Sequence, residues 1–101
     1  MTAFNVVRFR LKPGTEADFL EAHRRVERSW PGLRRFTVVK AGDNRMFVIG
    51  EWDSMESLAA ARPQMIAVLD SFRHTLEDMG GGLGLTDPIS GTAVLEMTAP
   101  G

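Results

Sequence analysis

One segment, Met46–Ser54, constrains the fold most, because an apolar strand runs there directly into the start of a helix. Its residues up to Trp52 are mainly apolar and aromatic, as in a strand buried within a sheet. Asp53 and Ser54 carry side-chain oxygens that cap helices, and Glu56 follows Asp53 at the spacing of a capping box. We therefore expect Trp52 at a strand-to-helix junction, a place where small folds often open a pocket.

A second strand precedes this segment and is predicted to form a hairpin with it. Residues Leu33–Ala41 alternate between two faces, with Phe36 and Val38 on the same face. The stretch Gly42–Asn44 then supplies the left-handed backbone positions of a tight reversal. We expect the two strands to pair in antiparallel orientation.

The first strand, Phe4–Leu11, is rich in β-branched and aromatic residues and ends at the turn Lys12–Gly14. Alternation divides its side chains between two faces. The nearly apolar face, which we expect helices to cover, carries Asn5, Val7, Phe9 and Leu11. The other face carries Phe4, Val6, Arg8 and Arg10.

Helical spacing begins at Thr15, where Asp18 is the capping-box partner. A single apolar stripe at i, i+4, i+7 and i+11 consists of Phe19, His23, Val26 and Trp30. Charged residues, Arg28 among them, occupy the remaining positions of this helix. Pro31 ends it, because proline disfavours helical geometry in the residue before it. The prediction is one helix from Thr15 to the region of Trp30.

The second half of the chain begins with a short helical piece, Met55–Ala61, and a break at Arg62-Pro63. A longer helix is predicted over Pro63–Met79. Its apolar stripe should be buried and consists of Met65, Val68, Leu69, Phe72, Leu76 and Met79.

Glycine and proline dominate the region that follows. Gly80–Gly84 stops the helix and is predicted to form a flexible flap that gates a cleft. Pro88–Gly91 is predicted as a turn, and Thr92–Met97 as the last strand.

The order strand, helix, strand, strand, helix, strand is that of the ferredoxin-like fold. We therefore predict an α+β protein with β-α-β-β-α-β order, an antiparallel sheet and both helices on one face. The open face would carry Phe4 and Val6, together with some of Phe36 and Val38 or the alternate residues of the hairpin. Because so apolar a face is unfavourable in water, we expect a second copy to cover it, which makes the protein a homodimer.

The composition excludes several classes of function. With 101 residues the chain fits one domain, and a net charge of −1 gives no reason to expect nucleic acid or an acidic membrane as a partner. The absence of cysteine excludes disulfides, thiolate metal sites and thiol nucleophiles. The N-terminal residues do not form a signal peptide and no apolar run could span a bilayer, so a cytoplasmic protein is expected.

Three segments, Val7–Gly14, Pro31–Leu33 and Phe47–Ser54, carry a resemblance to a known family and span nearly the whole chain in the family's order. On these residues the sequence resembles the antibiotic-biosynthesis-monooxygenase family of the dimeric α+β-barrel superfamily. The resemblance implies a single domain of this kind over residues 1–101, of which 98–101 are expected to be a frayed tail. It also implies a homodimer.

The family contains cofactor-independent oxygenases of polycyclic phenols and quinols, and also haem-degrading monooxygenases. The haem-degrading members use an asparagine, a tryptophan and a histidine where this sequence has Val7, Ala61 and Ser71. The resemblance therefore disfavours haem degradation and implies a monooxygenase that acts on an aromatic, quinol-type small molecule without a cofactor. The alternative is a non-catalytic dimer that binds a small ligand or serves a stress-related role on the same scaffold.

Five residues are candidates for a site beneath the helices. His23 could serve as the base for a phenol proton, and Asn5 as a polar anchor for substrate or dioxygen. Trp52, Phe9 and Phe72 are expected to contact an aromatic substrate. Each has a structural alternative: an interior hydrogen-bonded histidine, a solvated amide at a strand end, or ordinary core packing.

Other charged residues are given surface or interface roles. Arg8 and Arg10 are expected to pair with a carboxylate at the dimer interface, either Glu51 or Glu96. With two histidines and no cysteine, no metal site is expected. His74 is expected to form a surface ion pair with a carboxylate one helical turn away, Asp70 or Asp78.

Overall fold

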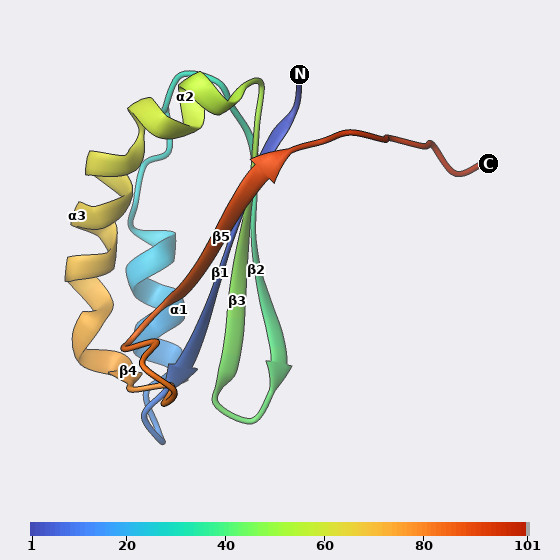
Figure 1. The fold of residues 1–101 in the computed structure, drawn as a ribbon. Coiled ribbons are helices and arrows are strands. Elements are labelled where there is room, and N and C mark those ends of the chain that lie inside the picture. The colour runs from blue at the N-terminus through green and yellow to red at the C-terminus, as the bar shows by residue number, and fades with distance from the viewer. Residues whose placement is uncertain (101) are drawn as a thin grey trace.

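The computed structural model describes residues 1–100 and folds them into one antiparallel sheet with helices on a single face (Figure 1). The strands are β1 (Ala3–Leu11), β2 (Leu33–Gly42), β3 (Arg45–Trp52), β4 (Leu76–Glu77) and β5 (Asp87–Thr92). The helices are α1 (Glu16–Arg24), α2 (Met55–Ala60) and α3 (Arg62–Phe72), and a 3-10 turn, η1 (Arg73–Thr75), follows α3. Gly101, the last residue of the predicted tail, lies outside the described residues.

The sheet has the order β2-β3-β1-β4, and β5 also pairs with β1. Every pairing is antiparallel. The register sets Val6 opposite Ile49 and Val7 opposite Val48, so inward and outward side chains form separate rows across the sheet. The predicted α+β, ferredoxin-like fold is confirmed, with the last strand divided into β4 and β5.

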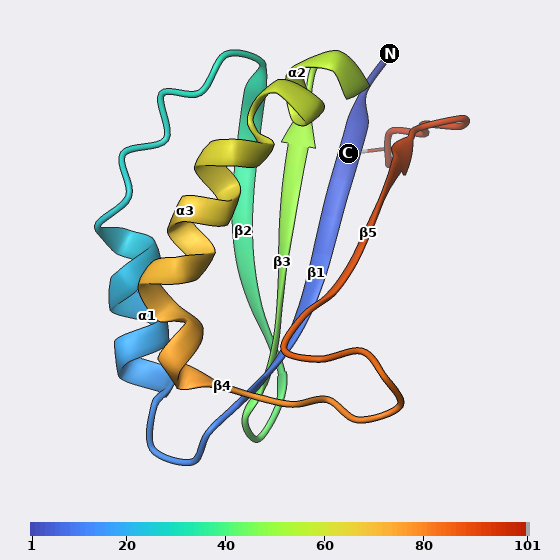
Figure 2. The same cartoon turned by 60° about the vertical axis from the view of Figure 1, so that its left-hand side comes forward.

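The hydrophobic core lies between the sheet and the two longer helices, α1 and α3, which Figure 2 shows side by side in front of it. Phe9 of β1, Phe19 of α1 and Phe72 of α3 meet edge to face, with ring centroids 5.1 to 5.5 Å apart. Met46 and Val48 join them from β3. The inward face predicted for β1 is therefore the face that the helices cover.

The first helix ends at Arg24, so its predicted continuation to Trp30 is wrong. Residues 25–32 form a loop instead, in which Arg28 Nη1 donates to the carbonyl oxygen of His23 at 2.7 Å. The same carbonyl accepts only a long backbone bond, 3.4 Å from the N–H of Val26, so Arg28 strengthens the end of the helix as basic side chains near a C-terminus commonly do.

The helix caps agree with the prediction only in part. Thr15 is the N-cap of α1, but its hydroxyl donates to a carbonyl of the preceding turn instead of accepting from the helix. Of the two residues predicted to cap α2, Ser54 is the N-cap, and its Oγ accepts from the backbone N–H of Ser57 at 3.1 Å. Because Ser57 then holds the third helical position, Glu56 is one residue too early to close a capping box.

The predicted break between the second and third helices is confirmed, since α3 begins at Arg62 and holds Pro63 in its first turn. The third helix nevertheless ends at Phe72, well before the predicted Met79. The Thr75 hydroxyl donates to the Phe72 carbonyl at 2.6 Å and competes with continued helical bonding. Leu76 is buried as expected, but it reaches the core from β4 and not from a helix.

The last strand is β5, so the strand predicted at Thr92–Met97 and the turn predicted at Pro88–Gly91 are wrong. Pro88 is compatible with this strand because, among residues 1–100, β5 pairs only with β1 and its other edge has no ladder bonds. The loop predicted over Gly80–Gly84 is confirmed, and its glycines at 80, 81, 82 and 84 have positive φ. Within residues 1–100, no helix has the length and apolarity needed to cross a membrane.

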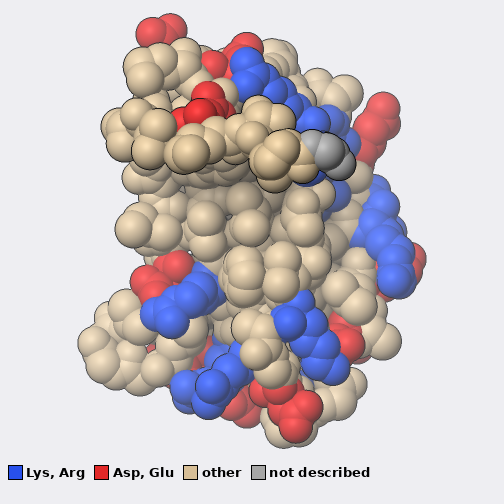
Figure 3. Space-filling view, turned by 90° about the vertical axis from the view of Figure 1, so that its right-hand side faces the viewer, with Lys and Arg blue, Asp and Glu red and all other residues tan. Residues whose placement is uncertain are grey.

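The outer sheet face, which no helix covers, carries a row of apolar side chains. The register places on it Phe4, Val6, Val39, Phe47 and Ile49. Phe36 and Val38, which were candidates for this face, pack against the inner core. Figure 3 shows this side of the molecule with an uncharged centre and most charged side chains around its margin. Such a surface has the anatomy of a protein interface, with an apolar centre and a polar rim.

Candidate functional site

A cavity of about 450 Å³ lies between the inner face of the sheet and the helices. This volume falls in the range of small-molecule sites. Most of its wall is apolar and comes from Val7, Phe9, Trp30, Phe36, Val48, Leu58, Met65, Ile66, Val68, Leu69, Phe72, Pro88 and Ile89. The polar residues are Asn5, His23, Arg28, Arg62, Thr86 and Ser90.

Four of the five predicted site residues contribute to this one cavity. Asn5 and Phe9 come from the inward face of β1, His23 from α1 and Phe72 from the end of α3. These residues are far apart in the sequence, and the packing of the helices on the sheet brings them to the same cavity. Trp52 is buried and does not belong to the cavity wall.

Asn5 is 9% exposed, and its amide is fixed by a neighbour on β3. The indole Nε1–H of Trp52 donates to Asn5 Oδ1 at 2.7 Å. Among residues 1–100, the Nδ2 group has only a weak contact, 3.8 Å from the sulfur of Met65. Trp52 therefore acts on the cavity through Asn5: it occupies the acceptor side of the amide and leaves the donor side for another partner.

Gly50 makes this pair of side chains possible. It lies opposite Asn5 in the sheet, and a Cβ at this position would overlap Asn5 Oδ1 and lie 2.8 Å from Trp52 Nε1. Only a residue without a side chain leaves room for the indole and the amide to meet over the strand. The packing of Asn5 against Trp52 therefore requires a glycine at position 50 of β3.

Trp30 was predicted as core of the first helix, but it lies in the loop after α1 and lines the cavity. Its ring is parallel to that of Trp52, with centroids 6.2 Å apart and an interplanar angle of 7°. The aromatic wall expected from Trp52 is therefore supplied by Trp30, and Trp52 stacks against Trp30 without lining the cavity. The positions of the two tryptophans in the sequence did not indicate that Trp30, and not Trp52, would line the cavity.

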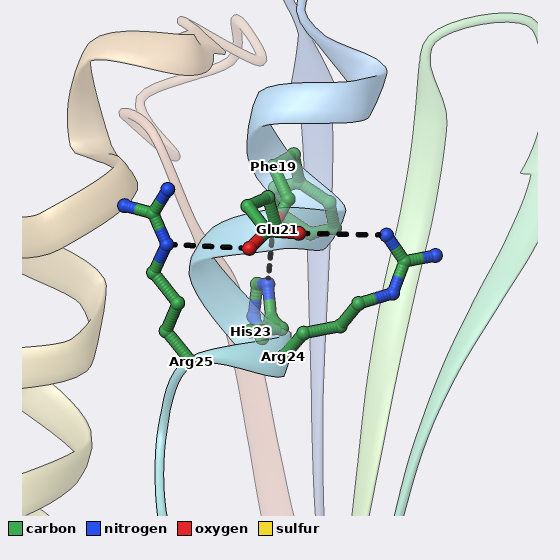
Figure 4. A network of polar contacts seen from close by, with 5 residues as sticks. All are labelled: Phe19, Glu21, His23, Arg24 and Arg25. Atoms are coloured by element: carbon green, nitrogen blue, oxygen red, sulfur yellow. Dashed lines mark hydrogen bonds and ion pairs between the residues drawn. The ribbon is translucent and has the colours of Figure 1, made fainter.

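His23 is 6% exposed, and its Nδ1 lies 2.8 Å from the carbonyl oxygen of Phe19 (Figure 4). A carbonyl only accepts, so Nδ1 carries the hydrogen and the neutral ring has its lone pair on Nε2. Burial lowers the pKa of His23, the hydrogen bond to Phe19 raises it, and the nearby charge of Arg28 lowers it, with a net downward shift. The imidazole is therefore neutral near pH 7, with Nε2 as its basic atom.

Arg28, Arg62, Thr86 and Ser90 are the polar residues of the cavity that sequence reasoning missed, and Arg28 was placed on the solvent side of a helix. Its guanidinium carbon lies 4.0 Å from the ring centroid of Phe36, which also stacks with His23 at 5.9 Å and 17°. Burial lowers the pKa of Arg28. Its Nε is buried and has no hydrogen-bond partner within residues 1–100.

Other charged side chains find partners away from the cavity. Arg8 pairs with Asp87 of β5 within its own chain, and the pairing with Glu51 or Glu96 at a dimer interface stays a prediction. On the outer side of α1, Glu21 pairs with Arg24 and Arg25, as Figure 4 shows. The charge that acts on the buried histidine is that of Arg28.

His74 does not form the predicted surface ion pair within the part of the chain that the structure describes. Asp70 pairs instead with Arg73 at 2.8 Å, and Asp78 accepts from the backbone N–H of Gly80 at 2.7 Å. Residues 1–100 also contain no group of three or more histidine and carboxylate side chains that could hold a metal ion.

Solved structures share this fold at low sequence identity. SnoaB from Streptomyces nogalater, a cofactor-independent oxygenase, matches with a TM-score of 0.73 at 20% identity, over 99% of this chain and 98% of that one. A protein from Mycobacterium tuberculosis gives a TM-score of 0.75 at 12% identity, over 97% and 100% of the two chains. A protein of unknown function from Nitrosomonas europaea gives 0.71 at 20% identity, over 99% and 96%.

No curated protein sequence matches the chain. The sequence profile of the family described as antibiotic biosynthesis monooxygenase matches residues 2–64, which is more than half of the chain. The matched part contains β1, α1, the hairpin and α2, and with them Asn5, His23 and the Trp52 junction. On this evidence the chain belongs to the antibiotic biosynthesis monooxygenase family.

Proposed function

We propose that this protein is a cofactor-independent monooxygenase of an aromatic, quinol-type small molecule. The observation that carries the proposal is the presence of two buried polar groups, Asn5 and His23, in the wall of one largely apolar cavity. Membership of the family supports it, and so does the fold shared with SnoaB, a cofactor-independent oxygenase.

In the proposed reaction the substrate itself supplies the reducing electrons. Nε2 of His23 removes the proton of a phenol, and the resulting phenolate transfers one electron to dioxygen. The two radicals combine at a ring carbon to give a peroxide, which takes the proton back from His23. Loss of water then leaves a quinone, as in the conversion of an anthrol to an anthraquinone. One atom of dioxygen enters the product, the other leaves as water, and both electrons come from the ring.

The remaining wall of the cavity serves this chemistry by position and by excluding water. Asn5 Nδ2 is a hydrogen-bond donor for the developing oxyanion, since Trp52 already occupies Oδ1. Phe9, Phe72 and Trp30 provide apolar and aromatic surface for the substrate ring. A dry site strengthens the electrostatic interactions of the few polar groups within it.

Dioxygen uptake with an anthrol as test substrate examines the proposal. His23→Ala is expected to lower kcat/KM by about 10²- to 10⁴-fold, the usual contribution of a general base. His74→Ala is the matched control, because His74 is an exposed histidine outside the cavity, and it should leave uptake unchanged. Uptake that is equal in wild type and His23→Ala would remove His23 from the mechanism.

Two results would instead favour the other functions considered. Binding of the anthrol without any dioxygen uptake would favour a non-catalytic ligand-binding protein on this scaffold. A shift of the Soret band when haem is added would favour the haem branch. The positions relevant to that branch are Val7 in the cavity wall, the buried Ala61 and the exposed Ser71, and none of the three supplies its asparagine, tryptophan or histidine.

We propose further that the protein is a cytoplasmic homodimer that associates through the outer sheet face. This face has an apolar centre and a charged margin (Figure 3), which suits a second copy of the same surface. The tail beyond β5 runs away from its own domain (Figure 1). Its apolar side chains are exposed and available for a partner: Val94, Leu95 and Met97.

A further inference from the structure

The positive charge in the cavity has no negative counterpart in the wall. The residues that line it include two arginines, Arg28 and Arg62, and no carboxylate. Neither arginine forms an ion pair within residues 1–100. A cation beside apolar surface loses part of its hydration, and an anion that joins it offsets this loss.

The contacts of Arg28 leave one particular edge of its guanidinium without a protein acceptor. Nη1 donates to the carbonyl oxygens of His23 at 2.7 Å and Val26 at 3.4 Å. Phe36 lies against the planar face of the group. Nε has no hydrogen-bond partner among the described residues. Nε and Nη2 together form the edge that binds a carboxylate through two parallel hydrogen bonds.

We infer that the cavity binds an aromatic carboxylate, with the ring against the apolar wall and the carboxylate on the Nε–Nη2 edge of Arg28. This inference rests on the proposed function in one respect, which is that the aromatic ring is the part of the ligand that is oxidised. Arg28 belongs to the loop over residues 25–32, which yields to an entering ligand more readily than a helix or strand does. Nε itself is buried, so the loop must shift to bring it to the cavity, and the carboxylate then accepts from the donor that the protein leaves unpaired.

A purely structural role for Arg28 makes a different prediction. If its only task is to bind the carbonyls at the end of α1, its loss would loosen the loop and weaken neutral and anionic ligands by the same factor. If it binds a carboxylate, its loss weakens the anionic ligand alone. A comparison of two ligands with the same ring and different charge separates these roles.

Isothermal titration calorimetry with anthracene-9-carboxylate and the neutral 9-anthracenemethanol makes this comparison. The wild type is expected to bind the carboxylate about 10- to 100-fold more tightly, the factor that a hydrogen bond to a charged group gives. Arg28→Gln should abolish this preference and leave the affinity for the alcohol unchanged. Arg24→Gln, which removes an exposed arginine of α1, is the matched control and should keep the preference.

Equal affinity of the wild type for both ligands would overturn the inference, as would binding of neither, or an equal loss of both in Arg28→Gln. If Arg28→Gln does not fold, Arg28→Lys keeps the charge without the two-bond edge and should retain only part of the preference. A wild type that prefers the carboxylate but oxidises no anthrol would refute the proposed function and leave this inference standing. Oxidation of anthrol with no preference for the carboxylate would do the reverse.

Discussion

The indole N–H of Trp52 donates a 2.7 Å hydrogen bond to Oδ1 of Asn5, and both residues are buried. The bond joins the last residue of β3 to the inward face of β1. It gives Trp52 the role of a positioning residue, which orients a polar group of the cavity without lining the cavity itself. Residues that hold a site in this way are as necessary as those that contact the ligand.

Trp52→Phe is expected to lower the free energy of unfolding by about 1–3 kcal/mol, because Asn5 Oδ1 would stay buried without a donor. Equilibrium urea denaturation measures the change. Adding Asn5→Val should recover part of the loss, since the orphaned acceptor is then removed as well. If the double variant loses the full sum of the two single changes, the hydrogen bond contributes no coupling energy.

Gly50→Ala should destabilise the protein by about 1–3 kcal/mol, because the new methyl group overlaps Asn5 Oδ1 and must displace the amide or the indole. Dioxygen uptake should fall with it, since the amide moves. Gly42→Ala is the matched control on β2: its nearest neighbour would be a carbon of the flexible Arg45 side chain at 3.8 Å. Thermal unfolding that shifts equally in both variants would contradict this account of Gly50.

The sheet was predictable because its signals are local. Side-chain alternation in β1 separates Phe9 from Arg8 without reference to any other strand. The hairpin follows from Gly42–Asn44, where Asn44 adopts the positive φ of 58° that such a reversal requires. The capping serine at 54 and the break before α3 are likewise short-range features.

The end of α1 and the composition of the site were not predictable in this way. The stripe through His23 continues in sequence to Val26 and Trp30, yet the helix stops, and Arg28 rests on Phe36 of β2. That contact is tertiary, so it cannot be predicted from the helical spacing of apolar residues. The strand predicted after Thr92 failed for a similar reason, because pairing with β1, and not local propensity, selects residues 87–92.

The pH dependence of stability follows from the buried His23. Its pKa lies below the usual 6.5, so the unfolded chain binds a proton at a higher pH than the folded protein does. The free energy of unfolding should therefore fall as pH drops below about 6.5, and stop falling once the folded protein also binds the proton. Urea denaturation from about pH 8 to about pH 5 measures this loss. His23→Gln should reduce it, whereas His74→Gln should leave it in place.

The same group sets the expected pH dependence of activity. A base must be neutral, so kcat/KM should rise through the lowered pKa of His23 and reach a plateau above it. The charged side chain that faces His23 is Arg28, while Glu21 is engaged with Arg24 and Arg25 outside the cavity. Arg28→Gln removes a nearby positive charge and should therefore move the midpoint to higher pH. A midpoint that stays in place in this variant would show that Arg28 does not act on the titrating group.

The homodimer is tested by placing a charge at the centre of the outer sheet face. Ile49 lies on this face opposite Val6, so Ile49→Glu would bury a carboxylate against the partner's apolar side chains. Light scattering after size-exclusion chromatography at micromolar concentration should give a dimer mass for the wild type and a monomer mass for Ile49→Glu. Ala67→Glu, on the exposed side of α3, is the control and should remain dimeric. A monomeric wild type, or a dimer that tolerates Ile49→Glu, would place the association elsewhere or exclude it.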